Sequence, residues 1–276
     1  MGTELLARGL DLAREPPEAW NLRRPDAVRE VHARYRAAGA QVAQTNTFGG
    51  SRPRLDKFAL ADELPSLNRE AVAHARSSRV SAVVASLGPT GIDPFAEGSA
   101  DRIRAAYEEQ ARHLVDAGVD GFHLETMYHP VEAIAGIAAL RQVSPSLPLI
   151  VSVTVALGDH GFQTPLGVPL PSMLDELLDA EPDALGLNCS LEARKLLGAL
   201  RLLRERTELP LLVQPQASEP SVGCKGEPRG DDPARFARDT VKLVDEGADA
   251  VGGCCGAGPD HIALLTRLLD EKFGPP

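Results

Sequence analysis

The 276-residue sequence has few aromatic side chains, no long apolar run and no excess of basic residues. Aromatic residues make up 4% of the chain, so the core must consist mainly of aliphatic side chains and alanine. No apolar stretch approaches the roughly 20 residues of a membrane-spanning helix. The net charge of −10 argues against a nucleic-acid-binding surface. The first 20 residues lack the features of a secretory signal, so we expect a cytoplasmic protein.

Cysteine is also scarce, with four residues at positions 189, 224, 254 and 255. Structural disulfides are rare in the cytoplasm, so clustered cysteines indicate metal binding or catalysis there. Cys254 and Cys255 are adjacent and lie between glycines, in the stretch VGGCCGAG. Cys224 falls in a polar loop, and we assign it no role.

A loose repeat organises the rest of the chain. It is clearest in RAAGAQVAQTNTF, VDAGVDGFHLET, LDAEPDALGLNCS and VDEGADAVGGCC. Each segment reads as a helix end, then a short apolar strand, then a polar or reactive residue. Gly39, Gly118 and Gly247 stand where a helix would end in a left-handed cap. Further apolar runs, SAVVASLGPTG, LPLIVSVTV and LPLLVQPQAS, are typical of parallel strands covered on both faces.

These repeated units predict an α/β protein with a (β/α)8 TIM barrel as a single domain over residues 1–276. A doubly wound open sheet is the alternative, but no early G-x-G-x-x-G turn opens a helix. Only seven strands can be counted, because the chain starts at a helix, MGTELLARG, where the first strand should just have ended. We interpret this start as a truncation, a misplaced start codon or a genuine variant. The strand ends are expected near Thr45, Gly88, Glu125, Thr154, Cys189, Gln214 and Cys254.

Three of the cysteines would lie around one mouth, at the carboxyl ends of the strands. Three thiolates from Cys189, Cys254 and Cys255 predict a zinc site with one open position, because structural zinc sites usually have four protein ligands. Zinc with three thiolates generates hydroxide poorly but suits the binding and activation of a substrate thiol. The alternative of inert buried cysteines fits a lone cysteine better than this pattern. We interpret His123 and His261 as structural, because they form no ligand pair.

Six motifs occur in the order MGTELLARG, QTNTFG, SLGPTG, HLETM, GLNCS and VGGCCGAGPDHI. Together they resemble the zinc-dependent homocysteine S-methyltransferases over essentially the whole chain. The resemblance implies zinc on the three cysteines and methyl transfer to the thiol of homocysteine, forming methionine. It also implies that Glu125 accepts the substrate's amino group and that Thr45 helps to hold its amino-acid end. Gln216 stands near the metal, where the family often has asparagine.

The chain departs from this family in two places. The family's first strand ends in Asp-Gly-Gly or Asp-Gly-Ala before the Met-Gly-Thr motif, and this pattern is absent ahead of Met1, which predicts weakened homocysteine binding. Gly256 follows the cysteine pair where the S-methylmethionine branch commonly has arginine, which favours the betaine or cobalamin branches.

Several functional alternatives stay open at this point. The methyl donor is betaine, S-methylmethionine or methylcobalamin, the last supplied by a separate corrinoid protein, and the oligomeric state is undetermined. The barrel could instead be a catalytically impaired binding or assembly subunit, or could methylate a different thiol or a selenol. In a further alternative, a phosphate-binding lyase, VGGCCG would cradle phosphate. No lysine stands at a strand end, which argues against a Schiff-base version of such a lyase.

Overall fold

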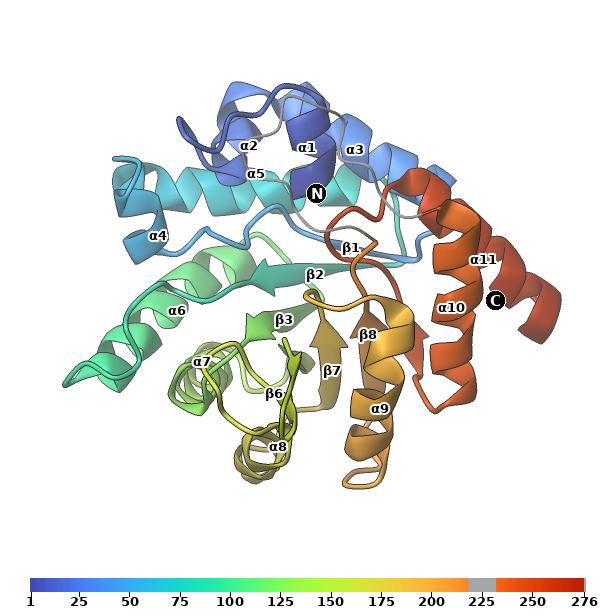
Figure 1. Cartoon of the computed structure of the whole chain (residues 1–276). Coiled ribbons are helices and arrows are strands. Elements are labelled where there is room, and N and C mark those ends of the chain that lie inside the picture. The colour runs from blue at the N-terminus through green and yellow to red at the C-terminus, as the bar shows by residue number, and fades with distance from the viewer. Residues whose placement is uncertain (218–231, 276) are drawn as a thin grey trace.

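The computed structural model describes residues 1–217 and 232–275, so Cys224 lies outside the described residues. Within them, seven parallel strands form one curled sheet (Figure 1). The strands follow one another in sequence order without a reversal, which is the topology of a TIM barrel and excludes the doubly wound alternative. In spatial order they are β1 (Val42–Gln44), β2 (Ala82–Leu87), β3 (Gly121–Met127), β4 (Leu149–Val153), β7 (Ala184–Asn188), β8 (Leu211–Gln214) and β9 (Ala250–Val251).

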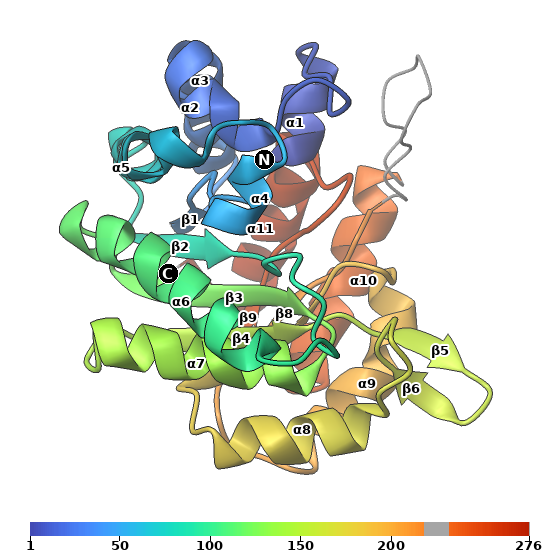
Figure 2. The same cartoon turned by 90° about the vertical axis from the view of Figure 1, so that its left-hand side faces the viewer.

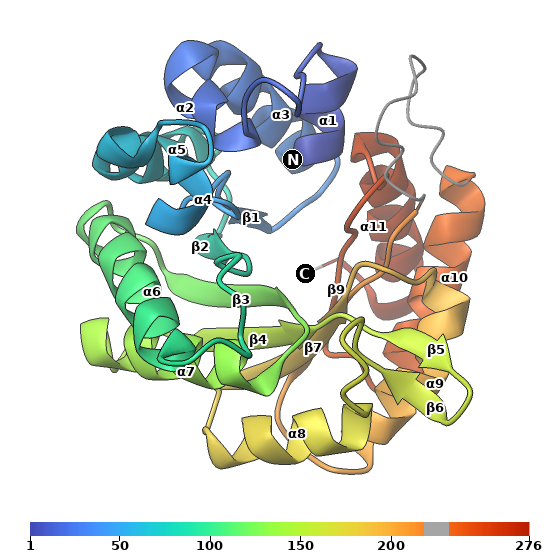
Figure 3. The same cartoon turned by 60° about the vertical axis from the view of Figure 1, so that its left-hand side comes forward.

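The sheet does not close into the predicted eight-stranded barrel. Figure 3 shows it curling from β1 round to β9, and these two edge strands do not pair in the described part of the chain. The observed fold is therefore a TIM-barrel-like half-barrel. Every expected strand is present, although β3 runs past Glu125 to Met127 and β9 stops short of Cys254.

Helices follow the strands and pack on the outer face of the sheet (Figures 1 and 2). Gly39, Gly118 and Gly247 each follow a helix with a φ of 98°, 85° and 103°, which confirms the predicted left-handed caps. The outer helices are α3 (Pro25–Ala37), α5 (Leu64–Ser77), α6 (Ser99–Asp116), α7 (Pro130–Val143), α8 (Leu170–Asp179), α9 (Ala193–Arg204), α10 (Pro233–Asp245) and α11 (Pro259–Phe273). None of the helices in the described ranges is long and apolar enough to cross a membrane.

Shorter elements complete the structure. Before β1 lie α1 (Gly2–Ala7), η1 (Pro17–Ala19) and α2 (Trp20–Arg23), and between β1 and β2 lie α4 (Arg52–Asp56) and η2 (Ala61–Glu63). The stretch after β4 contains an antiparallel hairpin of β5 (Ala156–Gly158) and β6 (Gly161–Gln163). The hairpin projects from the rest of the molecule (Figure 2).

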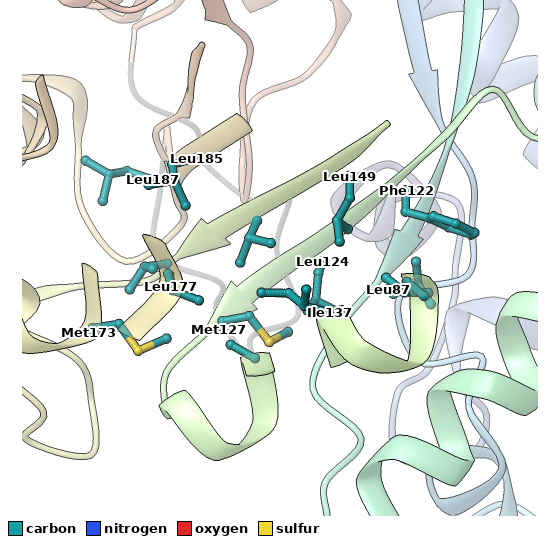
Figure 4. Packing of buried hydrophobic residues seen from close by; sticks show 14 of the residues in the cluster. Leu87, Phe122, Leu124, Met127, Ile137, Leu149, Met173, Leu177, Leu185 and Leu187 are labelled. Atoms are coloured by element: carbon teal, nitrogen blue, oxygen red, sulfur yellow. The ribbon is translucent and has the colours of Figure 1, made fainter. Parts of the chain in front are cut away.

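The main aliphatic core lies between the sheet and the outer helices (Figure 4). Because successive side chains of a strand point to opposite faces, alternate residues enter this core, except at the irregularity of β3 between Leu124 and Met127. The buried side chains that Figure 4 labels come from four strands and from α7 and α8, and Phe122 is the one aromatic among them: Leu87, Phe122, Leu124, Met127, Ile137, Leu149, Met173, Leu177, Leu185 and Leu187.

The concave face of the sheet is polar toward the carboxyl ends of the strands. TIM barrels usually fill this space with branched aliphatic side chains. Here the alternate strand positions carry polar side chains that bond to one another across the interior: Gln44, Ser86, His123, Glu125, Ser152, Asn188 and Gln214. This face therefore forms a hydrogen-bonded layer beneath the mouth.

The helical layer bridges the open side of the sheet. Tyr35 at the end of α3 donates its hydroxyl to the carbonyl of Ala257 over 2.7 Å. Thr266 of α11 donates to the carbonyl of Ala38 over 3.1 Å. The first and last outer helices are thus joined, although β1 and β9 are not paired in the described residues.

Candidate metal centre and substrate site

Three cysteines converge at the carboxyl ends of the strands. Cys189 follows β7, and Cys254 and Cys255 follow β9. Their Sγ atoms all lie within 4.8 Å of one another, and those of Cys189 and Cys255 are 3.6 Å apart. This separation is far longer than a disulfide bond of about 2.05 Å, so the thiols are free. The structure thus brings together the three cysteines that the sequence singled out.

The spacing of the sulfurs suits a tetrahedral metal ion. With zinc–sulfur bonds of about 2.3 Å, two tetrahedral thiolate ligands lie about 3.8 Å apart. The distance between Cys189 and Cys255 is close to this value. Among the described residues, no histidine or carboxylate joins this group of possible ligands. Three thiolates fill three tetrahedral positions and leave the fourth for a further ligand.

The backbone of β8 and of the segment that follows it aligns both cysteine segments. The Cys189 amide donates to the carbonyl of Gln214 over 3.1 Å. The Cys254 amide donates to the carbonyl of Pro215 over 2.9 Å, and the Ala217 amide donates to the carbonyl of Cys255 over 2.8 Å. Because β8 lies between β7 and β9, these bonds hold the sulfur-bearing loops at a set separation.

Backbone strain accumulates at the ends of β3 and β7. Cys189, Ser190 and Thr126 have φ values of 62°, 54° and 63°, a left-handed conformation that residues with side chains seldom adopt. Such conformations persist where the surroundings hold them, and they cluster at functional sites. The Ser190 hydroxyl, which bonds to that of Thr154 over 2.6 Å, is one such restraint.

The three thiols shift one another's pKa values. Hydrogen bonds from Cys254 and then Cys255 lower the pKa of Cys189 to about 3. The hydrogen bond to Cys189 raises the pKa of Cys254, and the same partner raises that of Cys255 to about 11. Hydrogen bonds from the two neighbouring thiols thus favour the thiolate form of Cys189, and a bound cation would favour loss of the remaining thiol protons.

Glu125 points into the interior from β3 and accepts hydrogen bonds from three sides. Its Oε1 accepts from the Ser86 hydroxyl and, over 3.0 Å, from Gln44 Nε2. Its Oε2 accepts from Asn188 Nδ2 over 3.2 Å. Burial raises the pKa of Glu125 to about 7, against the opposing effect of the Ser86 bond. A carboxyl group held by neutral donors in this way would gain strongly from a cationic ligand.

The other two predicted substrate residues are buried near the same strand ends. The Thr45 hydroxyl accepts from the Ser86 amide over 3.1 Å and bonds to the Thr47 hydroxyl over 2.5 Å. Because Thr47 donates its own proton to the Ser86 carbonyl, Thr45 is the donor in that pair and keeps only a lone pair for a ligand. Gln216 lies in the segment that pairs with the cysteine loop. Its backbone N–H donates to the carbonyl of Leu191 over 3.1 Å.

Sequence reasoning missed Gln44, Ser86 and Asn188. Each lies at an inward position of its strand and bonds to Glu125. A signal was present, because polar residues recur at alternate positions inside otherwise apolar strands. Asn188, moreover, directly precedes Cys189.

Parallel strands with converging thiols and an inward carboxylate at their carboxyl ends define a TIM-barrel-like protein with a candidate cysteine metal centre. Comparison with known proteins specifies this class. The family model of homocysteine S-methyltransferase matches residues 1–269, and the chain belongs to this family.

Curated relatives carry the same kind of domain. The chain is 30% identical over 266 residues to methionine synthase of Mycobacterium leprae (strain TN), and 30% identical over 288 residues to methionine synthase of Mycobacterium tuberculosis (strain ATCC 25618 / H37Rv). These alignments cover 91% and 98% of the chain but 22% and 24% of the relatives. The chain therefore spans about a quarter of the length of these methionine synthases.

A solved structure resembles the whole chain. The metallated form of the homocysteine methyltransferase MmuM from Escherichia coli superposes with a TM-score of 0.80 and 26% identity, covering 97% of this chain and 93% of that one. The apo form of the same enzyme gives a TM-score of 0.74 over 97% and 92% of the two chains.

Proposed function

We propose that this protein transfers a methyl group to the thiol of homocysteine, forming methionine, with zinc held by Cys189, Cys254 and Cys255. The convergence of these three sulfurs within 4.8 Å carries the proposal. Membership of the homocysteine S-methyltransferase family supports it. The curled sheet would then correspond to seven strands of a (β/α)8 barrel with its mouth at the thiols.

The chemistry requires a sulfur nucleophile at neutral pH. When bound, zinc would supply a positive charge that lowers the pKa of a substrate thiol. The chain itself contributes the ligands and their spacing, set by the bonds from β8. The substrate sulfur then attacks the methyl carbon in line. A sulfur–carbon bond forms while the bond from that carbon to the donor breaks, and the electron pair stays with the donor.

The amino-acid end of homocysteine would be held at the inner face of β3. Glu125 would accept the ammonium group, because its carboxyl group faces the interior and is held there by three neutral donors. Thr45 would add a lone pair to the same group. Gln216 would line the metal side of the pocket, since its segment pairs with the cysteine loop.

The methyl donor is betaine, S-methylmethionine or a methylated corrinoid on a separate protein. The reducing cytoplasm, where we place the protein, would keep the three thiols available for the metal.

The proposal is tested by metal analysis and by an assay for methionine. The protein, purified without chelators, should contain about one zinc per chain. With homocysteine it should form methionine from at least one of betaine, S-methylmethionine and methylcobalamin. A protein that binds no zinc at micromolar concentrations and forms no methionine with any donor would contradict the proposal.

A further inference from the structure

The inner face of the sheet contains two glutamines that meet across the interior. Gln214 of β8 donates its Nε2 to Oε1 of Gln44 on β1 over 2.8 Å, although 170 positions separate them in the sequence. Gln44 in turn donates its Nε2 to Oε1 of Glu125 over 3.0 Å. A line of hydrogen bonds thus runs from the strand that aligns the cysteine loops to the carboxyl group at the opposite wall.

The partners fix the direction of this line. In its ionised form, which the proposed binding of an ammonium group requires, Glu125 only accepts hydrogen bonds, so the NH2 end of Gln44 faces it. The carbonyl end then faces Gln214, which offers its own NH2. Reversing the Gln44 amide would place two oxygens against each other at Glu125 and two NH2 groups against each other at Gln214.

His123 completes the arrangement below Glu125. Its Nδ1 lies 2.8 Å from Gln44 Nε2, and its Nε2 lies 2.7 Å from the Ser152 hydroxyl. With the proton on Nε2, the ring accepts from Gln44 and donates to Ser152. Both hydrogens of the Gln44 NH2 group are then used, one by His123 and one by Glu125, so the amide has a single satisfied orientation.

The arrangement costs stability at one end. Oε1 of Gln214 is buried and has no hydrogen-bond partner among the described residues. Such an atom is expensive to bury, and a shorter apolar side chain would avoid the cost. Gly252 faces the same side chain, and a β-carbon at that position would lie 3.3 Å from Gln214 Nε2. Glycine at position 252 thus leaves room for the Gln214 side chain beside it.

From these contacts we infer that Gln44 is a positioning residue for Glu125, held in its orientation by Gln214, and that it sets the preference for thiols that carry an amino group. This inference rests on the proposed function, in which Glu125 receives the ammonium group of homocysteine. Gln44 would act through Glu125 alone and would not contribute to metal binding.

The test compares two thiols on the zinc-loaded full chain. The first is homocysteine, and the second is 4-mercaptobutanoate, which is homocysteine without its amino group. In Gln44→Met the Kd for homocysteine should rise about tenfold, as expected for the loss of a hydrogen bond to a charged group. The Kd for 4-mercaptobutanoate and the zinc content should not change. Gln214→Met should act in the same direction and more weakly.

Two further variants separate positioning from a general effect on the fold. Gln142→Met, at an exposed position of α7, should leave both Kd values unchanged. Glu125→Gln should abolish most of the preference for homocysteine, and adding Gln44→Met to it should cause little further loss, because the two residues act as a unit.

The outcomes distinguish the inference from the proposed function. Two results would overturn the role of Gln44 and leave the methyltransferase proposal intact. One is that Gln44→Met weakens the binding of both thiols equally, and the other is that its effect on the Kd for homocysteine adds fully to that of Glu125→Gln. A wild-type protein that binds zinc but binds both thiols equally well would overturn the role of Glu125, and with it that of Gln44. A wild-type protein without zinc or methionine formation would contradict the proposed function itself.

Discussion

Asn188 donates its Nδ2 to Oε2 of Glu125 over 3.2 Å, and so connects the residue before Cys189 with the proposed ammonium acceptor. The same amide group donates to the Thr126 hydroxyl over 2.8 Å, and its Oδ1 accepts from the Thr126 amide over 2.9 Å. Asn188 is buried, so these bonds form away from water. The side chain thereby sets the distance between the sulfur end and the amino end of the site.

Replacing Asn188 by alanine should weaken both the fold and the site. The change leaves the Thr126 amide and Oε2 of Glu125 without their partner, which should lower the free energy of unfolding by about 2 kcal/mol. Zinc should still bind, because the cysteines keep their backbone bonds. Urea unfolding followed by metal analysis checks both parts. An unchanged free energy of unfolding would show that Asn188 does not hold β3 and β7 together.

Glu125 should make the protein less stable as the pH rises from about 4.5 to 7. The carboxyl group has a pKa of about 7 when folded, raised by burial from its usual value of 4.5. In this window the unfolded chain loses the proton first, which favours unfolding. Glu125→Gln removes the effect, so its stability relative to wild type should be roughly 1 to 3 kcal/mol greater at pH 8 than at pH 4.5. Denaturant titrations at several pH values on metal-free protein measure this difference, and a constant offset between the two proteins would contradict it.

His123 should have the opposite effect and make the protein more stable as the pH rises. Burial lowers the pKa of His123 from 6.5 to about 3. Below pH 6.5 this histidine is protonated in the unfolded chain but stays neutral in the folded protein. The free energy of unfolding therefore falls as the pH falls toward 3. His123→Gln can still accept from Gln44 and donate to Ser152. Denaturant titrations between pH 6.5 and 3 should therefore show a smaller fall in the free energy of unfolding for this variant than for the wild type. If the free energy of unfolding falls as steeply with acid in the variant as in the wild type, other groups cause the loss of stability.

Glu132 is a buried carboxylate on α7 that holds the loop after β2. Its Oε1 accepts from the Thr90 amide over 2.6 Å and from the Thr90 hydroxyl over 2.7 Å, and its side chain is 1% exposed. Glu132→Ala leaves the amide and the hydroxyl of Thr90 buried without their acceptor. It should therefore lower the free energy of unfolding by about 2 to 4 kcal/mol. Glu97→Ala is the matched control, because Glu97 is exposed in the same loop and should change stability by less than about 0.5 kcal/mol. Equal effects of the two changes would contradict the anchoring role.

Local sequence patterns predicted most of the strands and the cysteine cluster. Apolar runs after Gly39, Gly118 and Gly247 mark strands because the helix must end before the strand can start. Cys189 and the Cys254–Cys255 pair stand at comparable strand ends, and carboxyl ends of parallel strands meet at one mouth. That geometry follows from topology alone.

The polar interior could not be obtained in the same way. The contact between Gln44 and Gln214 depends on the curl of the sheet and on the register of every strand between them. The single lone pair left to Thr45 depends on the direction of the Thr47 bond, which no spacing reveals. The hairpin of β5 and β6 was missed because its strands are three residues long and lie on the surface.

The most direct test of the account is the zinc content and methionine formation of the triple variant Cys189→Ser, Cys254→Ser, Cys255→Ser. Cys224→Ser serves as the control, since no role is assigned to Cys224. The control and the wild type should each bind about one zinc and methylate homocysteine, whereas the triple variant should do neither. A folded triple variant that still binds stoichiometric zinc and forms methionine would contradict the central claim.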